Sequence, residues 1–341
     1  MIHFLGIDVS KATFDVAFRT PKRIIHKVFR NETSGFEQLA KFLRSKKVEK
    51  AHACLEATGT YAYELSLFLL EKSHLVTQVN PLRIKGHKQS LSIHGKTDKL
   101  DAIVILDYAE RFRDNLRLWE PPPPKMQRLR ALLTRREQLI VMEQMESNRL
   151  KVSMSSEEEH RSVERLYSFL QEEKEKIEKE LKELFKSDEA MAEDLKNLMS
   201  IPGVGVTTAM MTIQLVGDIH RFESARQLAA FVGVAPYPKE SGTSVRGGSK
   251  ISRRGNSHYR KVLYMAALSA KLYNPGFQDF AREKDAEGKP KKVVTLAVAR
   301  KLLHLMFAIL KSKKPYDVEK VATSRLKAES MRKEKAKKSK K

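Results

Sequence analysis

The first 110 residues constrain the fold more than any other feature, because strand-like runs and helical segments alternate there in a fixed order. Residues 3–9 form a near-continuous apolar run, and 13–19 and 23–29 follow at hairpin spacing with apolar residues at alternate positions. A period of two is typical of a strand that buries one face. Three antiparallel strands are therefore expected first.

Helices and strands alternate after these strands. Helical periodicity is found in 34–45 and 61–72, short apolar strands are found in 51–55 and 75–80, and a further helix begins after Thr97. The order β-β-β-α-β-α-β-α is that of the ribonuclease H-like nuclease fold. We therefore expect an α/β domain of this type at the N-terminus.

Two aspartates, Asp98 and Asp101, stand at the head of the last of these helices. Three residues are about one helical turn, so the two carboxylates project from one face. They repel each other unless a cation or a proton lies between them, which favours a metal site. The alternative is that Thr97 is an N-cap and Asp98 only complements the helix dipole.

Two further carboxylates occupy positions from which they can join this pair. Asp8 falls on the first strand, and Glu56 falls at the carboxyl end of the fourth. Ligand sites in such sheets gather at strand ends, so Asp8, Glu56, Asp98 and Asp101 are expected to converge. Hard oxygen ligands of this kind bind Mg²⁺, and two ions about 3.5–4 Å apart clamp the attacking and leaving oxygens of a phosphodiester.

Asp15 and Asp107 are weaker candidates for the same site. Asp15 is expected to point to the opposite face of its strand or to solvent, and Asp107 lies well past the first helical turns. Neither is therefore included in the predicted metal site.

The charge of the chain indicates its partner. Its 65 Lys and Arg residues against 42 Asp and Glu residues give a net charge of +23, which suits a polyanion such as nucleic acid.

The single cysteine, Cys54, excludes a disulfide framework within the chain. No signal peptide is visible, and the apolar stretch 293–310 contains Arg300, Lys301 and His304, which indicates a core helix. A cytoplasmic protein without membrane contact is expected.

A run of four prolines, 121–124, marks the first domain boundary as a stiff extended spacer of about 12 Å. Beyond it, 163–185 has apolar residues close to a heptad repeat: Leu166, Leu170, Ile177, Leu181 and Leu184. Ser156 and Glu159 form a plausible capping box for this helix. The pattern predicts either an oligomerising coiled coil or a helix pair that packs only within its own chain.

Two segments of the C-terminal half suit phosphate contact. Pro202-Gly203-Val204-Gly205 precedes a helix of small residues and is similar to a helix-hairpin-helix element, whose glycines let backbone N–H groups approach a phosphate; a plain glycine turn is the alternative. Between 239 and 261 there are seven Lys or Arg residues against the single acid Glu240, with four glycines among them. This stretch predicts a pliable phosphate-binding loop, and most serines in such a loop only hydrogen-bond phosphate oxygens.

Four domains are expected from these features: 1–120, a nuclease-like domain; 121–195, the proline linker and coiled-coil helices; 196–315, a mainly α-helical domain with the helix-hairpin-helix-like element; and 316–341, a disordered basic tail.

Five motifs together resemble the DEDD transposases, or recombinases, of the insertion-sequence-110 family, which includes DNA invertases. The matching segments are Gly6-Ile7-Asp8-Val9-Ser10-Lys11, Leu55-Glu56-Ala57-Thr58-Gly59-Thr60-Tyr61, Lys96-Thr97-Asp98-Lys99-Leu100-Asp101-Ala102, Ile201-Pro202-Gly203-Val204-Gly205, and Glu240-Ser241-Gly242 with Arg246-Gly247 beyond it. They occur in the family's order and cover about 1–118 and 196–315.

The resemblance implies a RuvC-like domain in which the four carboxylates bind Mg²⁺, and a transposase domain in which Ser241 is the nucleophile. It raises Ser241 above Ser244 and Ser249, which spacing alone does not separate. It also implies guidance by a structured bridge RNA, and a dimer or tetramer in which the serine of one subunit completes the tetrad of another. The residues assigned to nucleic-acid contact are Lys96, Gly203, Gly205, Arg246, Lys250, Arg253 and Arg254.

The function implied is that of a transposase or site-specific recombinase of an insertion sequence, which cuts and rejoins DNA through a phosphoserine. Three alternatives stay open from the sequence. One is a DNA invertase of the same family. Another is a Mg²⁺-dependent junction nuclease that uses water instead of Ser241. The third is a basic nucleic-acid-binding scaffold without turnover.

Overall fold

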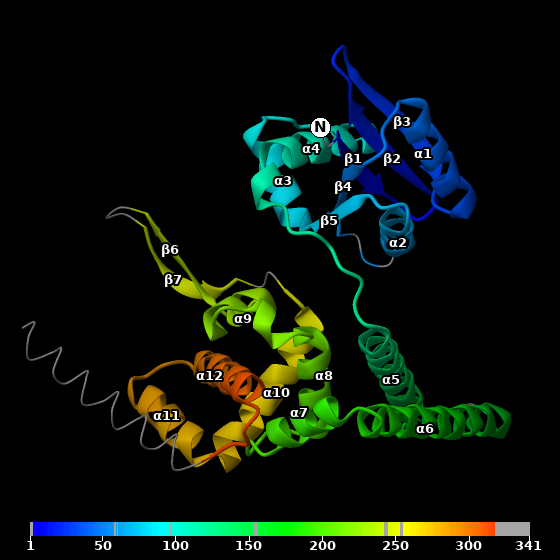
Figure 1. The fold of residues 1–341 in the computed structure, drawn as a ribbon. Helices are drawn as coiled ribbons and strands as arrows, with labels where there is room; N and C mark the ends of the chain where they lie inside the picture. Colours follow the sequence, from blue (N-terminus) through cyan, green and yellow to red (C-terminus); the bar gives the residue numbers. More distant parts are fainter. Residues whose placement is uncertain are drawn as a thin grey trace, which may run out of the picture. The chain divides into compact units, whose positions relative to one another are not determined.

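The computed structural model describes residues 3–57, 59, 61–95, 97–152, 156–241, 245–252 and 255–317, with backbone only for the strand residues among 238–250. The chain forms two compact units, one up to Pro122 and the other from Pro123 onward. Each unit is described by itself (Figure 1).

The first unit is built on a five-stranded mixed sheet in the order β3-β2-β1-β4-β5. Strands β1, β2 and β3 are antiparallel, whereas β4 and β5 run parallel to β1. This order and direction are those of the ribonuclease H-like fold, as the sequence predicts. The elements are β1 His3–Val9, β2 Thr13–Arg19, β3 Ile24–Arg30, α1 Thr33–Ser45, β4 Ala51–Glu56, α2 Tyr63–Glu71, β5 Leu75–Val79, α3 Pro81–Ser90 and α4 Asp98–Arg111.

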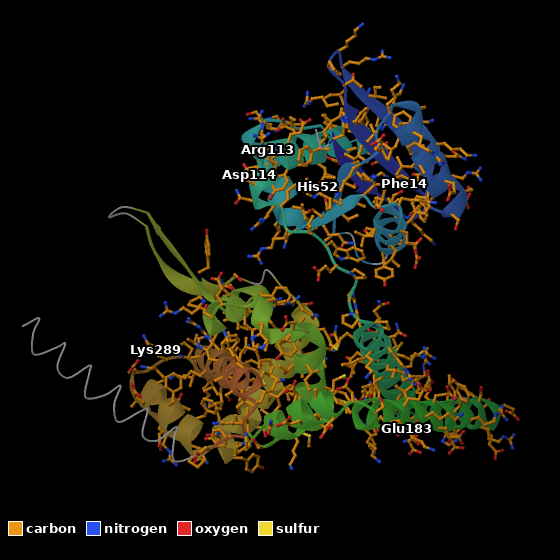
Figure 2. The ribbon with its side chains drawn as sticks, viewed as in Figure 1. Phe14, His52, Arg113, Asp114, Glu183 and Lys289 are labelled. Atoms are coloured by element: carbon orange, nitrogen blue, oxygen red, sulfur yellow. The ribbon has the colours of Figure 1, made fainter. Side chains whose placement is uncertain are left out.

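Helices cover both faces of this sheet. Side chains such as Leu5, Ile7 and Phe14 form one cluster with the apolar residues of α1 and α2. Phe14, labelled in Figure 2, stacks on Phe29 with ring centroids 5.4 Å apart. On the other face, Cys54 packs in a cluster with residues of α3 and α4. The alternation of buried side chains along each strand therefore decides which helix layer a residue meets.

Helix α3 was not expected from the sequence, because its residues show little apolar periodicity. Its start nevertheless carries two known signals. The Asn80 side chain accepts a hydrogen bond from the Leu82 N–H at 2.8 Å, and Pro81 occupies the first helical position. An asparagine cap followed by proline is a typical helix start.

The second unit is mainly helical. Its elements are α5 Pro124–Arg149, α6 Glu157–Lys186, α7 Glu189–Met199, α8 Val206–Val216, α9 Ala225–Val232, β6 Pro236–Ser241, β7 Val245–Ile251, α10 Ser257–Tyr273, α11 Pro275–Ala286 and α12 Lys291–Ser312. One difference from the sequence-based expectation is that the expected pliable loop contains a two-stranded antiparallel hairpin. Helix α11 is capped by the side chain of Asn274.

Helices α5 and α6 pack against each other within the chain. Arg136 pairs with Glu178 at 2.8 Å, and Lys174 pairs with Glu143 at 2.6 Å. Of the seam residues, Leu170, Leu181 and Leu184 are buried, whereas Leu166 is 44% exposed. Ser156 caps α6 by accepting from the Glu159 N–H, as predicted. The intrachain helix pair is thus present, and oligomerisation through these helices stays a prediction.

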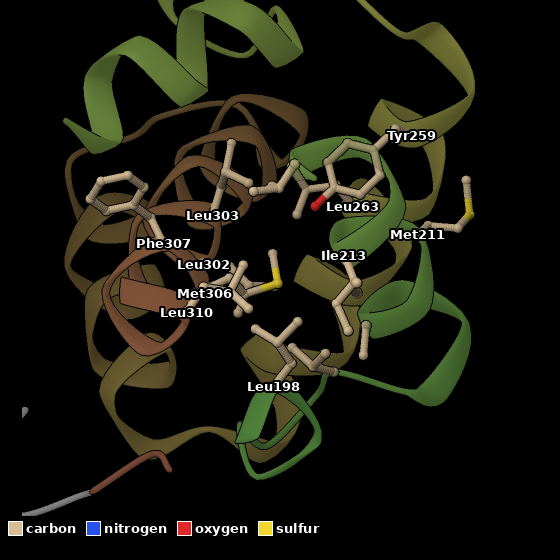
Figure 3. Close-up of a cluster of buried hydrophobic side chains, with 14 of the residues drawn as sticks. Leu198, Met211, Ile213, Tyr259, Leu263, Leu302, Leu303, Met306, Phe307 and Leu310 are labelled. Carbon is tan, nitrogen blue, oxygen red and sulfur yellow. The ribbon is translucent and has the colours of Figure 1, made fainter. Parts of the chain in front are cut away.

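Helix α12 lies in the core of the second unit, and its buried side chains Leu302, Leu303 and Met306 meet Tyr259 and Leu263 of α10 (Figure 3). Among the described residues it is the one helix long and apolar enough to cross a membrane. Its packing in this structure is that of a core helix, which agrees with the interpretation of the sequence.

Candidate active site

Strand pairing places Asp8 and Glu56 side by side. Ile7 lies opposite Leu55 in the parallel pair of β1 and β4, so the next residue on each strand, Asp8 and Glu56, stands at the same level. Leu55 points into the cluster with α1 and α2, and Cys54 points toward α4. Since successive residues alternate between faces, Glu56 shares the α4 face with Cys54.

Gly6 lets α4 approach this face closely. A Cβ atom at Gly6 would lie 2.2 Å from the Ala102 carbonyl oxygen and 2.3 Å from the Leu106 nitrogen. Any side chain here would push α4 away from β1. Asp8 follows Gly6 by two residues and therefore lies on the same face of the sheet, next to the N-terminal turn of α4.

That first turn carries Asp98 and Asp101. The turn is fixed by Thr97, whose hydroxyl oxygen accepts a hydrogen bond from the Leu100 N–H at 3.2 Å. The capping role predicted for Thr97 is confirmed. An N-cap at Thr97 does not exclude a metal site at Asp98 and Asp101, so the two interpretations of this segment are compatible.

The pKa of Asp8 reflects both its burial and the negative charges around it. Burial, followed by the charges of Asp101, Glu56 and Asp98, raises the pKa of Asp8 to about 6. Asp15 adds a smaller contribution of the same sign. Glu56, Asp98 and Asp101 therefore lie close enough to Asp8 for their charges to act on it, a repulsion that a bound cation would relieve.

Lys88 of α3 is paired with Asp101, and both side chains are largely buried, with 17% and 19% of their surface exposed. Within the part of the chain that the structure describes, no three His, Cys, Asp or Glu side chains are arranged tightly enough to hold a metal as they stand. The donor set, four carboxylates, nevertheless has the chemistry that Mg²⁺ requires. The chemistry of the donor set therefore suits a divalent cation, and in this structure the cation that Asp101 meets is the Lys88 ammonium.

The prediction for Asp15 is wrong. Asp15 is the direct partner of Asp8 in the β1–β2 pair, and residues opposite each other point to the same face. It is only 6% exposed, and His26 lies 2.6 Å away on β3. The His26 contact satisfies the buried carboxylate, which explains why it does not need solvent.

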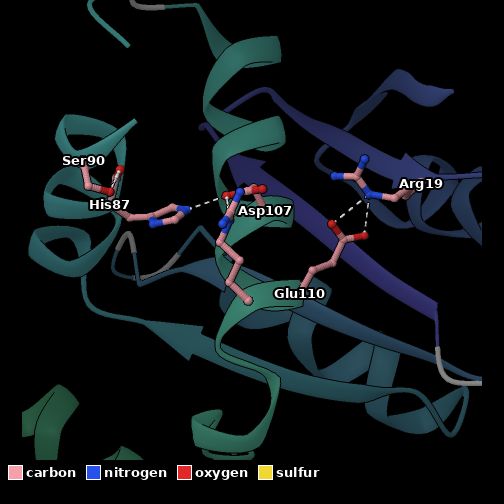
Figure 4. Close-up of polar contacts among 6 residues, drawn as sticks. Arg19, His87, Ser90, Asp107 and Glu110 are labelled. Carbon is pink, nitrogen blue, oxygen red and sulfur yellow. Dashed lines mark hydrogen bonds and ion pairs between the residues drawn. The ribbon is translucent and has the colours of Figure 1, made fainter. Parts of the chain in front are cut away.

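Asp107 has a structural role that fits its lower rank. His87 of α3 and Arg111 lie 2.8 Å and 2.7 Å from its Oδ2 (Figure 4). Burial raises the pKa of Asp107, but the hydrogen bonds from Arg111 and His87 outweigh burial and lower it overall. One turn further along, Glu110 accepts from Arg19 Nε at 2.8 Å (Figure 4). These contacts attach α4 to α3 and β2, which keeps its first turn in place.

Ser241 is the last residue of β6 and pairs with Val245, the first residue of β7. It therefore stands at the turn end of the two-stranded hairpin. Arg246 pairs with Glu240, and Lys250 with Tyr237, on the same ladder. The hairpin thus carries the predicted nucleophile and two of the predicted phosphate-binding residues on one short element.

Of the other residues predicted to contact nucleic acid, Lys96, Arg253 and Arg254 lie outside the described residues. Gly203 has a left-handed backbone with φ of 98°, and a Cβ there would come within 2.5 Å of Ala270 in α10. These two features account for the glycine through packing alone. Gly205 is the N-cap of α8, and phosphate binding at both glycines stays a prediction.

Sequence reasoning missed Lys88 and His26 as neighbours of the site and placed Asp15 on the wrong face. The alternation of β2 held a signal for Asp15, because Phe14 and Val16 are apolar and the hairpin spacing sets Asp15 opposite Asp8. Lys88 lies on α3, the helix that the sequence did not predict. Its pairing depends on how α3 packs against α4, which no local pattern encodes.

Two family models match this chain. A model described as "Transposase" covers residues 5–156, and one described as "Transposase IS116/IS110/IS902 family" covers 195–282. The first match includes all four carboxylates, and the second includes Ser241.

Individual relatives give the same result. The chain is 30% identical over 320 residues to the pilin gene-inverting protein of Moraxella bovis. The aligned region spans 92% of this chain and 97% of that protein. It is 44% identical over 91 residues to the transposase for insertion sequence element IS1111A of Coxiella burnetii. This aligned region covers 26% of this chain and 23% of the relative.

Among solved structures, Thermus thermophilus RuvC in complex with a Holliday junction substrate aligns with 35% of this chain and 100% of its own, at 10% identity and a TM-score of 0.27. That score is too low to add to what the strand order already shows. The two family matches and the near full-length relative decide the assignment: the chain belongs to the IS110 family of DEDD transposases and is a DNA transposase or recombinase.

Proposed function

We propose that this protein is a site-specific recombinase of a mobile element that cuts and rejoins DNA through a phosphoserine at Ser241, assisted by Mg²⁺ at Asp8, Glu56, Asp98 and Asp101. The observation that carries the proposal is the convergence of three further carboxylates on Asp8, whose charges add to the effect of burial in raising its pKa to about 6. Such a cluster is costly for a fold and is explained by a cation that belongs there.

Each carboxylate has a defined place in this proposal. Asp8 and Glu56 are held by adjacent strands, and Asp98 and Asp101 by the capped first turn of α4. Together they would hold the cation on the α4 face of the sheet. Mg²⁺ bound there supplies positive charge to a phosphodiester and favours ionisation of a nearby hydroxyl group.

Ser241 supplies the nucleophile. Its hydroxyl oxygen bonds to phosphorus, one phosphorus–oxygen bond of the DNA strand breaks, and the released strand end takes up a proton as the serine hydroxyl gives one up. The phosphodiester linkage is conserved, so the strand can be rejoined to a new partner without ATP. This property is the reason why a recombinase benefits from a serine where a nuclease uses water.

Cationic residues near Ser241 would bind the DNA backbone and the negative charge that develops at phosphorus. Arg246 and Lys250 share its hairpin, and Arg253 and Arg254 follow in sequence. Lys96, Gly203 and Gly205 would add backbone contacts. The net charge of +23 supports binding to both DNA and a bridge RNA that directs the choice of sites.

Self-association is part of the same proposal, in a dimer or tetramer in which Ser241 of one chain meets the carboxylates of another. The α5–α6 pair supports it, since Val141, Met145 and Phe169 expose 51%, 52% and 53% of their surface. Exposed apolar groups on a helix pair favour contact with another surface. We place the active protein in the cytoplasm, where it has access to the chromosome.

DNA inversion is the second candidate activity. It is favoured by the relative named as a pilin gene-inverting protein, which matches across 97% of its length. Inversion and transposition use the same strand chemistry and differ in the arrangement of the DNA sites. A plasmid carrying the element's two ends in inverted orientation distinguishes them, because an invertase changes the order of restriction fragments without releasing the segment.

The test is a trapping assay. The protein is incubated with Mg²⁺, RNA transcribed from the flank of its element and a labelled junction DNA, then analysed on a denaturing gel. We expect a slow-migrating protein–DNA adduct that is lost in Ser241→Ala and in Asp98→Asn. Ser249→Ala is the matched control, because it removes a serine from the same hairpin and should keep the adduct.

Cleavage that leaves no adduct and survives Ser241→Ala would show that water is the nucleophile and that the serine assignment is wrong. DNA binding without cleavage under every condition, unchanged by Asp8→Asn, would support the scaffold hypothesis instead.

A further inference from the structure

Helix α9 carries one large apolar side chain that is exposed. Leu228 and Val232 of this helix are buried in the core, whereas Phe231 exposes 45% of its surface. A single exposed apolar side chain needs no explanation by itself. The groups around the ring therefore decide whether it is a binding surface.

The Phe231 ring is held in a stack with Arg221 and Phe222, two residues that precede α9. The guanidinium carbon of Arg221 lies 4.7 Å from the centroid of the Phe222 ring and 5.0 Å from that of Phe231. The two rings are 5.4 Å apart and tilted by 59°. Arg221 Nη2 also donates to the Leu215 carbonyl oxygen at 3.1 Å. Because the guanidinium is fixed by a hydrogen bond as well as by the rings, it orients the exposed ring of Phe231.

The chain around this Arg221–Phe222–Phe231 stack is basic. Residues 218–260 contain eight Lys or Arg residues against three acids. One of the cations is attached to the end of α9, where Arg260 Nη1 of α10 donates to the carbonyl oxygen of Val232 at 3.1 Å. An exposed aromatic ring among cations is the combination that binds single-stranded nucleic acids, in which bases stack on the ring and the cations follow the backbone.

The stack stands at the base of the hairpin that carries Ser241 (Figure 1). The Ala235 carbonyl oxygen, just after α9, accepts from the Ser252 N–H, just after β7, at 3.2 Å. A Cβ atom at Gly255 would lie 2.4 Å from the Phe231 carbonyl oxygen, so the chain that leaves the hairpin passes directly against the end of α9. The six residues of β6 span about 17 Å, which is a few nucleotides along a strand.

We infer that the Arg221–Phe222–Phe231 stack binds an unpaired base of the DNA strand whose phosphodiester Ser241 attacks, an inference that rests on the proposed function. Phe231 provides the face on which the base stacks, and Arg221 orients this ring and brings positive charge to the neighbouring phosphate group. Every base has such a face, so the contact selects unpaired strands over duplex without reading their sequence. The occupant is DNA because the hairpin above the stack carries the residue that is proposed to attack DNA.

The first part of the test measures binding in EDTA, so that it is independent of metal and cleavage. Anisotropy titrations use a short single-stranded DNA, the duplex of the same sequence and the RNA of the same sequence. We expect Phe231→Leu to weaken binding of the single-stranded DNA by about tenfold, because a stacked base is lost. Duplex binding should change by less than about twofold, because its bases are already stacked on one another and only its backbone is contacted.

Two variants serve as controls. Phe231→Trp keeps an aromatic face and should retain the affinity for single-stranded DNA. Tyr273→Leu removes an aromatic ring that is 68% exposed at the other end of α10, and should change every affinity by less than about twofold. A ring kept only for folding would lower the Tm in Phe231→Leu and leave the preference for single strands unchanged.

The second part locates the contact by photocrosslinking. A single-stranded DNA that contains 5-iodouracil is irradiated in the presence of the protein, and the modified peptide is identified by mass spectrometry. We expect the modification on the peptide that contains Phe231, and its loss from that peptide in Phe231→Leu. Modification of Tyr273 instead would place the base elsewhere.

Each outcome decides the inference. A loss of single-stranded DNA binding in Phe231→Leu that Phe231→Trp does not share supports it, whether or not RNA binding falls as well. Equal losses on single strand and duplex would overturn it, as would equal effects of Phe231→Leu and Tyr273→Leu, or a loss confined to RNA. If the trapping assay fails while this loss is observed, the serine chemistry is wrong and the base-stacking site stands, since binding in EDTA needs neither Ser241 nor the carboxylates.

Discussion

The carboxylate site and the Ser241 hairpin differ in what holds their key residues in place. Asp8 and Glu56 belong to adjacent strands of a five-stranded sheet, and Asp98 and Asp101 to a helix packed directly on that sheet. Ser241 stands at the turn end of a sheet with only two strands. A two-stranded hairpin has little stability by itself in water, whereas a covered sheet is rigid.

From this difference we expect the two regions to have separate roles, one in metal binding and the other in nucleophilic attack. The carboxylates are held by regular secondary structure, and Gly6 allows the helix that carries Asp98 and Asp101 to pack tightly on β1. Under the proposed function, the hairpin presents Ser241 to a phosphodiester on an element of only two strands. Metal binding should therefore be a property of the first unit alone, and nucleophilic attack should require both units.

The largest expected effect separates the two regions by function. Asp98→Asn and Ser241→Ala should each reduce strand exchange by about 10³-fold or more, because each removes a group without which the step fails. Only Asp98→Asn should also abolish the rise in Tm that Mg²⁺ produces. If Ser241→Ala loses the Mg²⁺ response as well, the proposed independence of the two regions is wrong.

The next effect tests the close packing beneath the carboxylates. Gly6→Ala places a Cβ 2.2 Å from the Ala102 carbonyl oxygen, so we expect a loss of about 3 kcal/mol in the free energy of unfolding, measured by urea denaturation. Gly86→Ala in α3, where a Cβ meets nothing within 4 Å, is the control and should stabilise by about 0.5–1 kcal/mol. Equal behaviour of the two variants would disprove the tight contact.

A smaller effect follows from the pKa of Asp8. A carboxyl whose pKa is raised from 3.8 to about 6 on folding binds its proton more tightly in the folded state, so its stabilising contribution is present below pH 4 and is lost as the pH rises through 6. At pH 8 without metal, Asp8→Asn should therefore stabilise the protein. The shift corresponds to about 3 kcal/mol at most, and solvent screening reduces this to about 1–2 kcal/mol.

The control for this prediction is the same comparison of Asp8→Asn with the unchanged protein at low pH. At pH 4 the Asp8 carboxyl is protonated in the folded protein, and the gain from Asp8→Asn should vanish. Thermal melts in EDTA between pH 4 and pH 8 measure the difference. A gain that is the same at both ends of this range would mean that the charge of Asp8 is not its cause.

The smallest expected effect concerns Lys88. Its ammonium pairs with Asp101 and, under the proposed function, would compete with a cation there. Lys88→Met should lower the Tm of the metal-free protein and increase Mg²⁺ affinity by about three- to tenfold, measured calorimetrically, because the competing charge is gone. Lys85→Met, which removes an exposed lysine from the same helix, should change neither. Weaker Mg²⁺ binding in Lys88→Met would contradict the competition.

The local patterns of the sequence were sufficient for most of the first unit and for part of its site. Short, near-continuous apolar runs predicted the strands that carry Asp8 and Glu56, and the three-residue spacing of Asp98 and Asp101 predicted their shared helix face. Asp15 was misplaced because its face depends on strand register, and Lys88 was missed because α3 has little apolar periodicity. Ser241 was selected by resemblance, since neighbouring serines in a basic loop are physically equivalent until the hairpin is formed.

The central claim is that the four carboxylates bind a divalent cation, and anomalous X-ray diffraction from crystals grown with Mn²⁺ tests it most directly. Mn²⁺ accepts the same oxygen ligands as Mg²⁺ and can be located by its anomalous signal. We expect the strongest signal on the α4 face of the sheet, with Asp8 and at least two of Glu56, Asp98 and Asp101 as ligands, and with the Lys88 ammonium moved away from Asp101. A strong signal elsewhere, with Lys88 still paired to Asp101, would contradict the claim.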